Sequence, residues 1–193
     1  MLSISVQRWL IIPLVASAAV LAVPTAASAK PIQFFEERAE AFWEVPHACA
    51  DGSTVPGTLL VSTTRAFSAP DTEDPTPTAR LQFLAVCPGG FSFSWGAPAV
   101  PATITSNRRL KHLTANGTGV ARDILGVSHP VTFDVAWQKA GPLERTVNAP
   151  GSITKERVQT ADGVVTFDGT VLFDGPSNHP TRPAPFIRVD IEK

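Results

Sequence analysis

The strongest constraint on the fold is a run near the middle of the chain in which large apolar residues occupy every second position. The apolar positions are Val131, Phe133, Val135 and Trp137, and they alternate with Thr132, Asp134 and other residues up to Gln138. Successive side chains of a β-strand point to opposite faces, so this period predicts a strand with one buried and one wet face. One-sided burial of this kind is typical of antiparallel sheets.

The same period recurs around Val165–Phe173 and in the final run Phe186–Ile191. From Thr54 onward, short runs rich in Val, Thr and Phe are separated by Gly, Pro, Asp and Asn. We therefore expect an all-β fold, a single-domain antiparallel β-sandwich, with a β-barrel as the alternative. Phe34–Trp43 fits helical or strand spacing, and we favour a strand because β structure follows. The expected inward residues are Phe83, Val131, Phe133, Val135, Trp137, Phe167, Val171, Phe173, Ile187 and Val189.

The first 29 residues have the order of a secretory signal peptide. Arg8 precedes an apolar run, Pro24 ends that run, and Ala27-Ser28-Ala29 supplies small residues for cleavage before Lys30. The apolar run is shorter than the roughly 20 residues that span a bilayer, so no retained membrane span is expected. We expect cleavage between Ala29 and Lys30, a secreted, extracellular protein, and one domain over residues 30–193.

The two cysteines of the chain, Cys49 and Cys87, both follow the expected cleavage site. An even number of cysteines in an oxidising compartment predicts a disulfide. A zinc site is the weaker alternative, because zinc takes four ligands and no paired Cys or His motif is nearby. A catalytic thiol would leave the other cysteine unpaired.

Charge argues against a nucleic-acid partner. The chain has 16 Lys and Arg against 17 Asp and Glu, and Arg8 is the one charged residue among positions 1–29, which leaves residues 30–193 with a net charge of −2. The basic cluster at residues 108–112 is short, and we interpret it as a solvated strand edge. Residues 68–78 contain three acids and three prolines and are expected to form a flexible loop.

Local catalytic motifs are sparse. Ser152-Ile-Thr-Lys155 matches the S-x-x-K pattern, but its companion motifs are missing and we favour a strand start. The four histidines, His47, His112, His129 and His179, are scattered, although His129 and His179 could converge on a metal. The acids Asp134, Asp168, Asp174 and Asp190 could pair across strands for glycoside hydrolysis, but each also fits an outward or turn position. We expect no catalytic, cofactor-binding or metal-binding residue, no cofactor, and no His–acid pair lining the largest pocket.

Aromatic residues give a positive indication of binding. Phe91, Phe93 and Trp95 share one side of a run whose other side carries serines. A core-facing strand is favoured, and an exposed platform for a sugar or a partner protein is the alternative.

Several strand fragments resemble short secreted β-rich proteins of actinobacteria. The resemblance rests on Phe42-Trp43 before Cys49, on Asp51-Gly52 and Gly57-Thr58 after it, and on Gly119-Val120 followed by His129–Trp137. The resemblance implies a β fold and export. The similar proteins have no assigned activity, so no functional residue is carried over to this chain.

The function that these observations favour is a secreted, non-catalytic binding or envelope-associated β-domain. Its expected partner is an extracellular protein or a glycan. A secreted hydrolase is the second hypothesis, because a catalytic site can be assembled from residues far apart in sequence. A proteinase inhibitor that uses the loop at 68–78 is the third.

Overall fold

The computed structural model describes residues 34–68, 72–73, 76–90, 92–107, 109–179 and 184–192. The strands are β1 (Phe34–Ala48), β2 (Thr54–Ser68), β3 (Thr72–Glu73), β4 (Thr78–Val86), β5 (Ser92–Ser106), β6 (His112–Asp123), β7 (Ser128–Ala149), β8 (Ser152–Phe167), β9 (Thr170–Pro176) and β10 (Phe186–Glu192). A short 3-10 helix, η1, spans Pro88–Gly90. No helix among the described residues is long and apolar enough to cross a membrane.

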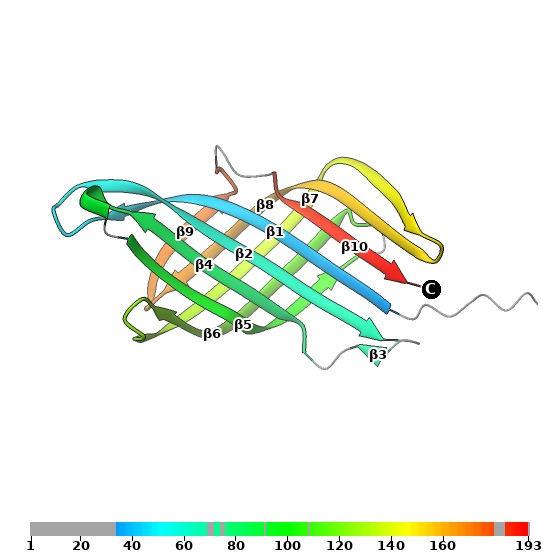
Figure 1. Ribbon diagram of the computed structural model, residues 1–193, viewed down its shortest axis with the longest axis horizontal. Helices are drawn as coiled ribbons and strands as arrows, with labels where there is room; N and C mark the ends of the chain where they lie inside the picture. Colours follow the sequence, from blue (N-terminus) through cyan, green and yellow to red (C-terminus); the bar gives the residue numbers. More distant parts are fainter. Residues whose placement is uncertain are drawn as a thin grey trace, which may run out of the picture.

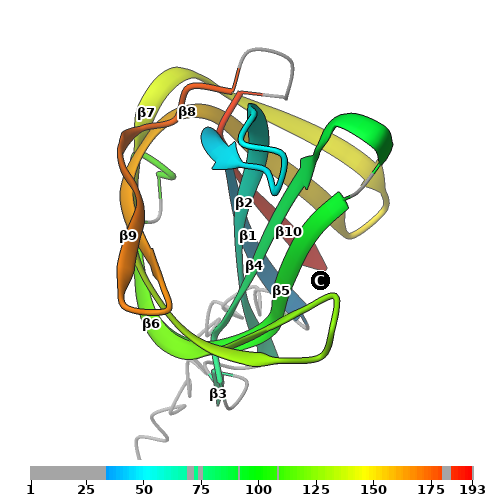
Figure 2. The same cartoon turned by 90° about the vertical axis from the view of Figure 1, so that its left-hand side faces the viewer.

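All these strands belong to one antiparallel sheet that closes on itself (Figures 1 and 2). β1 pairs with β2 on one side and with β10 on the other, so the ladder runs β1–β2–β4–β5–β6–β7–β8–β10 and returns to β1. β3 adds to β2, and β9 adds to β8. The expected all-β class with antiparallel pairing is confirmed, as is a strand rather than a helix at Phe34–Trp43.

This closed sheet has two distinct ends. The disulfide end holds the β1–β2 and β6–β7 turns and the bond between Cys49 and Cys87. The hairpin end holds the start of β1, the end of β10 and the β7–β8 turn. Figure 1 shows the β7–β8 hairpin beside β10 at this second end.

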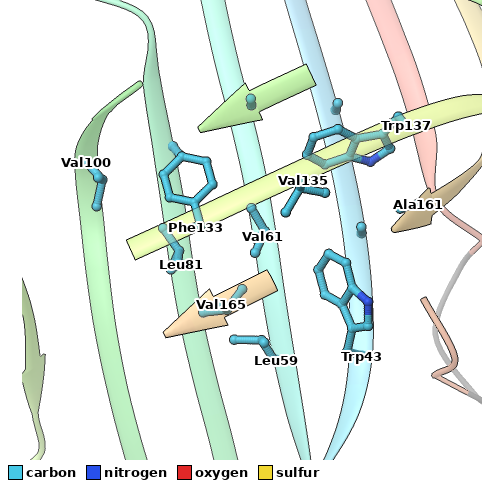
Figure 3. Close-up of a cluster of buried hydrophobic side chains, with 14 of the residues drawn as sticks. Trp43, Leu59, Val61, Leu81, Val100, Phe133, Val135, Trp137, Ala161 and Val165 are labelled. Carbon is cyan, nitrogen blue, oxygen red and sulfur yellow. The ribbon is translucent and has the colours of Figure 1, made fainter. Parts of the chain in front are cut away.

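The inner faces of the strands pack into one continuous apolar core (Figure 3). Most of the expected inward residues are buried there, namely Phe83, Val131, Phe133, Val135, Trp137, Ile187 and Val189. Phe167 and Phe173 are partly buried against the same core. Many of the remaining core positions are alanines, which leave room for Trp43 and Trp137 inside the sheet.

Val171 was expected inside and is 58 % exposed, so that prediction was wrong. The register between β8 and β9 shifts between Val165 and Thr166. The shift places Val171 opposite Thr166, a residue of the outer face. A one-residue change of register reverses the face of every following side chain.

Along one edge of β1, side chains in place of a neighbouring strand make hydrogen bonds to the backbone. β10 pairs with β1 only as far as Glu40. Beyond that point, Trp137 Nε1 donates to the carbonyl of Glu40 at 3.0 Å, and Ser177 Oγ donates to the carbonyl of Phe42 at 2.6 Å. The amide of Glu44 donates to Asn178 Oδ1 at 2.9 Å. The segment after β9 thereby satisfies backbone groups that a strand would otherwise pair.

The predicted disulfide between Cys49 and Cys87 is confirmed, with a Cα–Cα distance of 5.9 Å. It joins the ends of β1 and β4. The expected loop at 68–78 contains the two-residue strand β3, which pairs with Phe67 and Ser68. Residues 69–71 and 74–75, and the expected signal peptide with its cleavage site at Ala29 and Lys30, lie outside the described residues.

Candidate functional site

A row of aromatic rings closes the interior at the disulfide end. Trp95 stacks on Phe167 with ring centroids 4.7 Å apart and on Phe83 at 6.1 Å. Phe93 continues the row and stacks on His47 at 4.7 Å. Trp95 is buried and Phe93 is half-buried, so the core-facing interpretation of this run is confirmed for these two residues. Phe91 lies outside the described residues.

The wall of the sheet is interrupted next to this aromatic row. Pro98 and Pro101 lie in β5 and have no N–H to donate to a neighbouring strand. The β5–β6 pairing accordingly breaks after Gly96 and resumes at Ala102 with a shifted register. The β4–β5 pairing also shifts, between Ala79 and Leu81.

A surface cavity of about 260 Å³ lies at this interruption. Its lining includes the side chains of Arg80, Arg122 and Ile124, and Trp95 contributes from the core. Arg80 Nη2 donates to Gln82 Oε1 at 3.3 Å, which holds one wall of the cavity. The cavity is therefore lined by two cations, Arg80 and Arg122, and one acid, Asp123, together with polar and apolar residues.

The β6–β7 turn borders the cavity and is organised by the carboxylate of Asp123. Its Oδ1 accepts hydrogen bonds from the amides of Leu125 at 2.9 Å and Val127 at 2.8 Å. Backbone bonds link Asp123 N to Val127 O and Gly126 N to Asp123 O. Gly126 adopts a φ of 81°, which glycine tolerates without strain. The amide of Ile124 donates to the carbonyl of Ser94, which ties the turn to β5.

This fixed turn exposes large aliphatic side chains. Ile124 is 60 % exposed, Leu125 81 % and Val127 50 %. Turns are usually polar, and contiguous exposed apolar groups mark interaction surfaces. The turn offers a hydrophobic contact whose backbone is already ordered.

Asp123 also contacts His129, which lies between two carboxylates. His129 Nε2 is 3.4 Å from Asp123 Oδ2, and Nδ1 is 3.7 Å from Asp168 Oδ2. Partial desolvation disfavours the charged form of Asp123, but hydrogen bonds from Val127, His129 and Leu125 outweigh it and lower the pKa of this carboxyl. Asp123 lines the cavity, whereas His129 is not among its lining residues, so the His129–Asp123 pair does not line it.

The S-x-x-K residues Ser152 and Lys155 lie in β8 and cannot act on each other. Three residues apart on a strand, their side chains point to opposite faces of the sheet. The proton transfer that this motif performs in enzymes needs the two groups in contact. The strand interpretation of this segment is confirmed.

The histidines do not converge. His179 Nε2 is hydrogen-bonded with Thr58 Oγ1 at 2.9 Å, whereas His129 contacts Asp123 and Asp168. His112 is exposed at the start of β6. In the described chain, the donor atoms of His47, Cys49 and Cys87 all lie within 4.8 Å of one another and could in principle hold a metal. The two cysteine sulfurs form the disulfide, and a disulfide lacks the thiolate that metals bind.

The acids considered for glycoside hydrolysis lie on the outer surface. Asp134 and Asp174 both sit opposite Val164 from flanking strands, so about two strand spacings, roughly 10 Å, separate them. Asp168 occupies the β8–β9 turn with a φ of 51°. Asp190 accepts hydrogen bonds from Arg188 and Thr154. Desolvation opposes its charge, but these bonds outweigh it and lower the pKa of Asp190.

Sequence reasoning missed the β6–β7 turn and the cavity beside it. The signal for the turn was Asp123-Ile-Leu-Gly126-Val127, where an Asp that can cap a turn and a glycine enclose aliphatic residues. The cavity had a weaker signal in the two prolines of β5. Its walls come from three strands, so no local pattern contains it.

Comparison with protein-family models, with curated proteins and with solved structures finds no match for this chain.

Proposed function

We propose that the protein is an exported binding domain without catalytic activity, and that the β6–β7 turn is its contact point for an extracellular protein. The observation that carries the proposal is the exposure of Ile124 and Leu125 on a backbone fixed by Asp123. Burying one such aliphatic side chain in an interface contributes about 1.5–3 kcal/mol. Little ordering entropy opposes that gain, because the turn is held by hydrogen bonds before a partner arrives.

A protein partner suits this surface better than a glycan. The exposed groups on the turn are aliphatic, whereas the aromatic rings that could stack on sugars are turned into the interior at Trp95 and Phe93. The cavity beside the turn adds Arg80 and Arg122. These two cations can pair with an acidic side chain of the partner at the rim of an interface. Export is supported by the N-terminal pattern, and the disulfide suits an oxidising compartment.

The geometry of His129 supports a non-catalytic role. A general base must leave one ring nitrogen available for the proton that it removes. Both nitrogens of His129 face carboxylate oxygens, of Asp123 and Asp168. The hydrolase alternative would require one of these contacts to open. The inhibitor alternative depends on a loop whose residues 69–71 and 74–75 lie outside the described chain.

The proposal is tested by capturing extracellular proteins from the producing cells on immobilised protein. The variant Leu125→Asp should lose the captured partner. Val147→Asp is the matched control, because Val147 is 64 % exposed at the hairpin end and its replacement should leave capture unchanged. Equal capture by both variants, or no specific capture by the wild type, would contradict the proposal. Turnover of an ester, peptide or glycan that His129→Ala abolishes would establish the hydrolase instead.

A further inference from the structure

The interior at the hairpin end contains buried polar and charged side chains among its apolar residues, in contrast to the aromatic disulfide end. Four polar or charged side chains are buried on the inner faces of the strands there: Glu37, Thr63, Arg157 and Gln159. A buried charge is costly unless it is paired and hydrogen-bonded. We therefore ask whether each of these buried groups has a hydrogen-bond or charge partner within the described chain.

Glu37 is fully accommodated. Its Oε2 accepts hydrogen bonds from Arg65 Nη2 at 2.7 Å and from Ser106 Oγ at 2.8 Å. Arg65 Nη1 donates to the carbonyl of Ile104 at 3.2 Å. The single buried acid of the described interior is thus already neutralised by Arg65.

Arg157 has no such partner. It is only 8 % exposed, and its Nε and Nη1 make no hydrogen bond within the described chain. Its neighbours in register are Ile187 of β10 and Leu143 of β7, whose side chains have no acceptor. Gln159, two residues further along the same face, donates from Nε2 to the carbonyl of Leu110, but its buried Oε1 accepts nothing from the described residues.

More positive charge faces the same way on the β7–β8 hairpin. Lys155 lies two residues before Arg157 and therefore on the same inner face. Arg145 of β7 lies directly opposite Lys155. Repulsion between these two positive charges destabilises the hairpin when no anion is bound. The acids Glu144 and Glu156 oppose each other on the other face of the hairpin. β6 begins at His112, opposite Gln138, so its pairing with β7 ends before this region.

We propose that the inner face of the β7–β8 hairpin binds a small oxyanion, a carboxylate or a phosphate group. Arg145 and Lys155 attract the anion to the hairpin end, and Arg157 holds it by hydrogen bonds from Nε and Nη1. Gln159 Oε1 accepts a hydrogen bond from a hydroxyl of the ligand. A buried water could accept a hydrogen bond from Arg157, but it would leave three cations on one face without a counter-charge. The site lies at the end opposite the β6–β7 turn, so it stands independently of the proposed function.

The test titrates the exported protein with sodium phosphate or sodium acetate against sodium chloride at constant ionic strength. Amide NMR signals of residues 143–147 and 153–159 should shift saturably. Arg157→Met should weaken binding about 10- to 100-fold, the change that follows the loss of hydrogen bonds from a charged group. Lys155→Gln should weaken it less. Arg38→Gln is the matched control, because Arg38 is an outer-face cation paired with Glu36, and it should leave binding unchanged.

A second measurement covers the anion-free protein. Arg157→Met should raise the melting temperature there, because it removes a buried charge that has no partner. Binding of phosphate alone identifies a phosphate group as the ligand, and binding of acetate alone identifies a carboxylate. A lower melting temperature for Arg157→Met together with identical anion responses in all variants would overturn the proposal. Partner capture at the β6–β7 turn is a separate readout that this outcome would not affect.

Discussion

Replacing Gly57 by alanine should destabilise the protein mainly through a clash with the ring of Phe83, with a lesser approach of 3.2 Å to the carbonyl oxygen of Val45. Gly57 lies in β2, and the ring of Phe83 in β4 covers it. A Cβ atom at Gly57 would lie 2.4 Å from Phe83 Cζ and 2.6 Å from Cε2. Carbon atoms pack at about 3.5–4.0 Å, so the ring must move by about 1 Å in a core without free space. Overpacking of this kind costs about 1–3 kcal/mol.

A double-mutant cycle isolates that contact. Phe83→Ala alone should cost about 3–5 kcal/mol, because it removes a fully buried ring. In that background, Gly57→Ala should cost much less than in the wild type, since the ring that it would strike is gone. The expected coupling between the two changes is about 0.5–3 kcal/mol. Gly96→Ala is the matched control, because its Cβ would meet nothing closer than 3.9 Å and the change should cost less than about 0.5 kcal/mol.

Urea unfolding monitored by tryptophan fluorescence provides the assay, with the disulfide intact. Trp43, Trp95 and Trp137 are all buried, so their emission reports loss of the core. If Gly57→Ala were as mild as Gly96→Ala, or if its cost were unchanged in the Phe83→Ala background, the placement of Phe83 over Gly57 would be refuted.

Three further predictions follow from the same structure. Phe133→Ala should cost about 3–5 kcal/mol in urea unfolding, and a cost below about 0.5 kcal/mol would reverse the assigned faces of β7. Replacing Cys49 and Cys87 together by serine should cost about 4 kcal/mol in the chain-entropy model, and thiol titration of the unfolded, unreduced wild type should find no free thiol. Because the pKa of Asp190 is lowered from its ordinary value of 3.8, its stabilising effect is present above about pH 4 and is lost as the pH falls through the lowered value. Asp190→Asn should therefore lower stability more at pH 7 than at pH 2, and an equal loss at both would contradict this.

The inner faces of the strands were predictable because alternation is a local property. Alternation within a few residues identifies the buried face of the runs Val131–Trp137 and Ile187–Val189. The disulfide could be predicted from the cysteine count alone. Sandwich and barrel share this alternation, so the closing pair of β1 and β2 could not be inferred from it. Val171 was misplaced because the irregularity that turns it outward lies in the pairing of two strands.

The candidate sites depend on contacts that are remote in sequence. Arg157 occupies an inward strand position. Only the strand register shows that its neighbours on β10 and β7 are Ile187 and Leu143, whose side chains cannot accept a hydrogen bond. The cavity depends on Pro98 in β5, because the β5–β6 pairing stops after Gly96 and Arg122, which are far apart in the sequence. Asp123 organises the β6–β7 turn locally, and its pattern was visible in the sequence, but its contact with His129 required the fold.

Site-specific photocrosslinking in the producing cells tests whether the β6–β7 turn contacts a protein partner. A photoreactive residue is introduced at Leu125 and, as the control, at Val147, which has a similar size and is also exposed. A discrete protein adduct is expected from position 125 and none from position 147. Adducts of equal yield from both positions, or no adduct from position 125, would contradict the assignment of the β6–β7 turn as the binding surface.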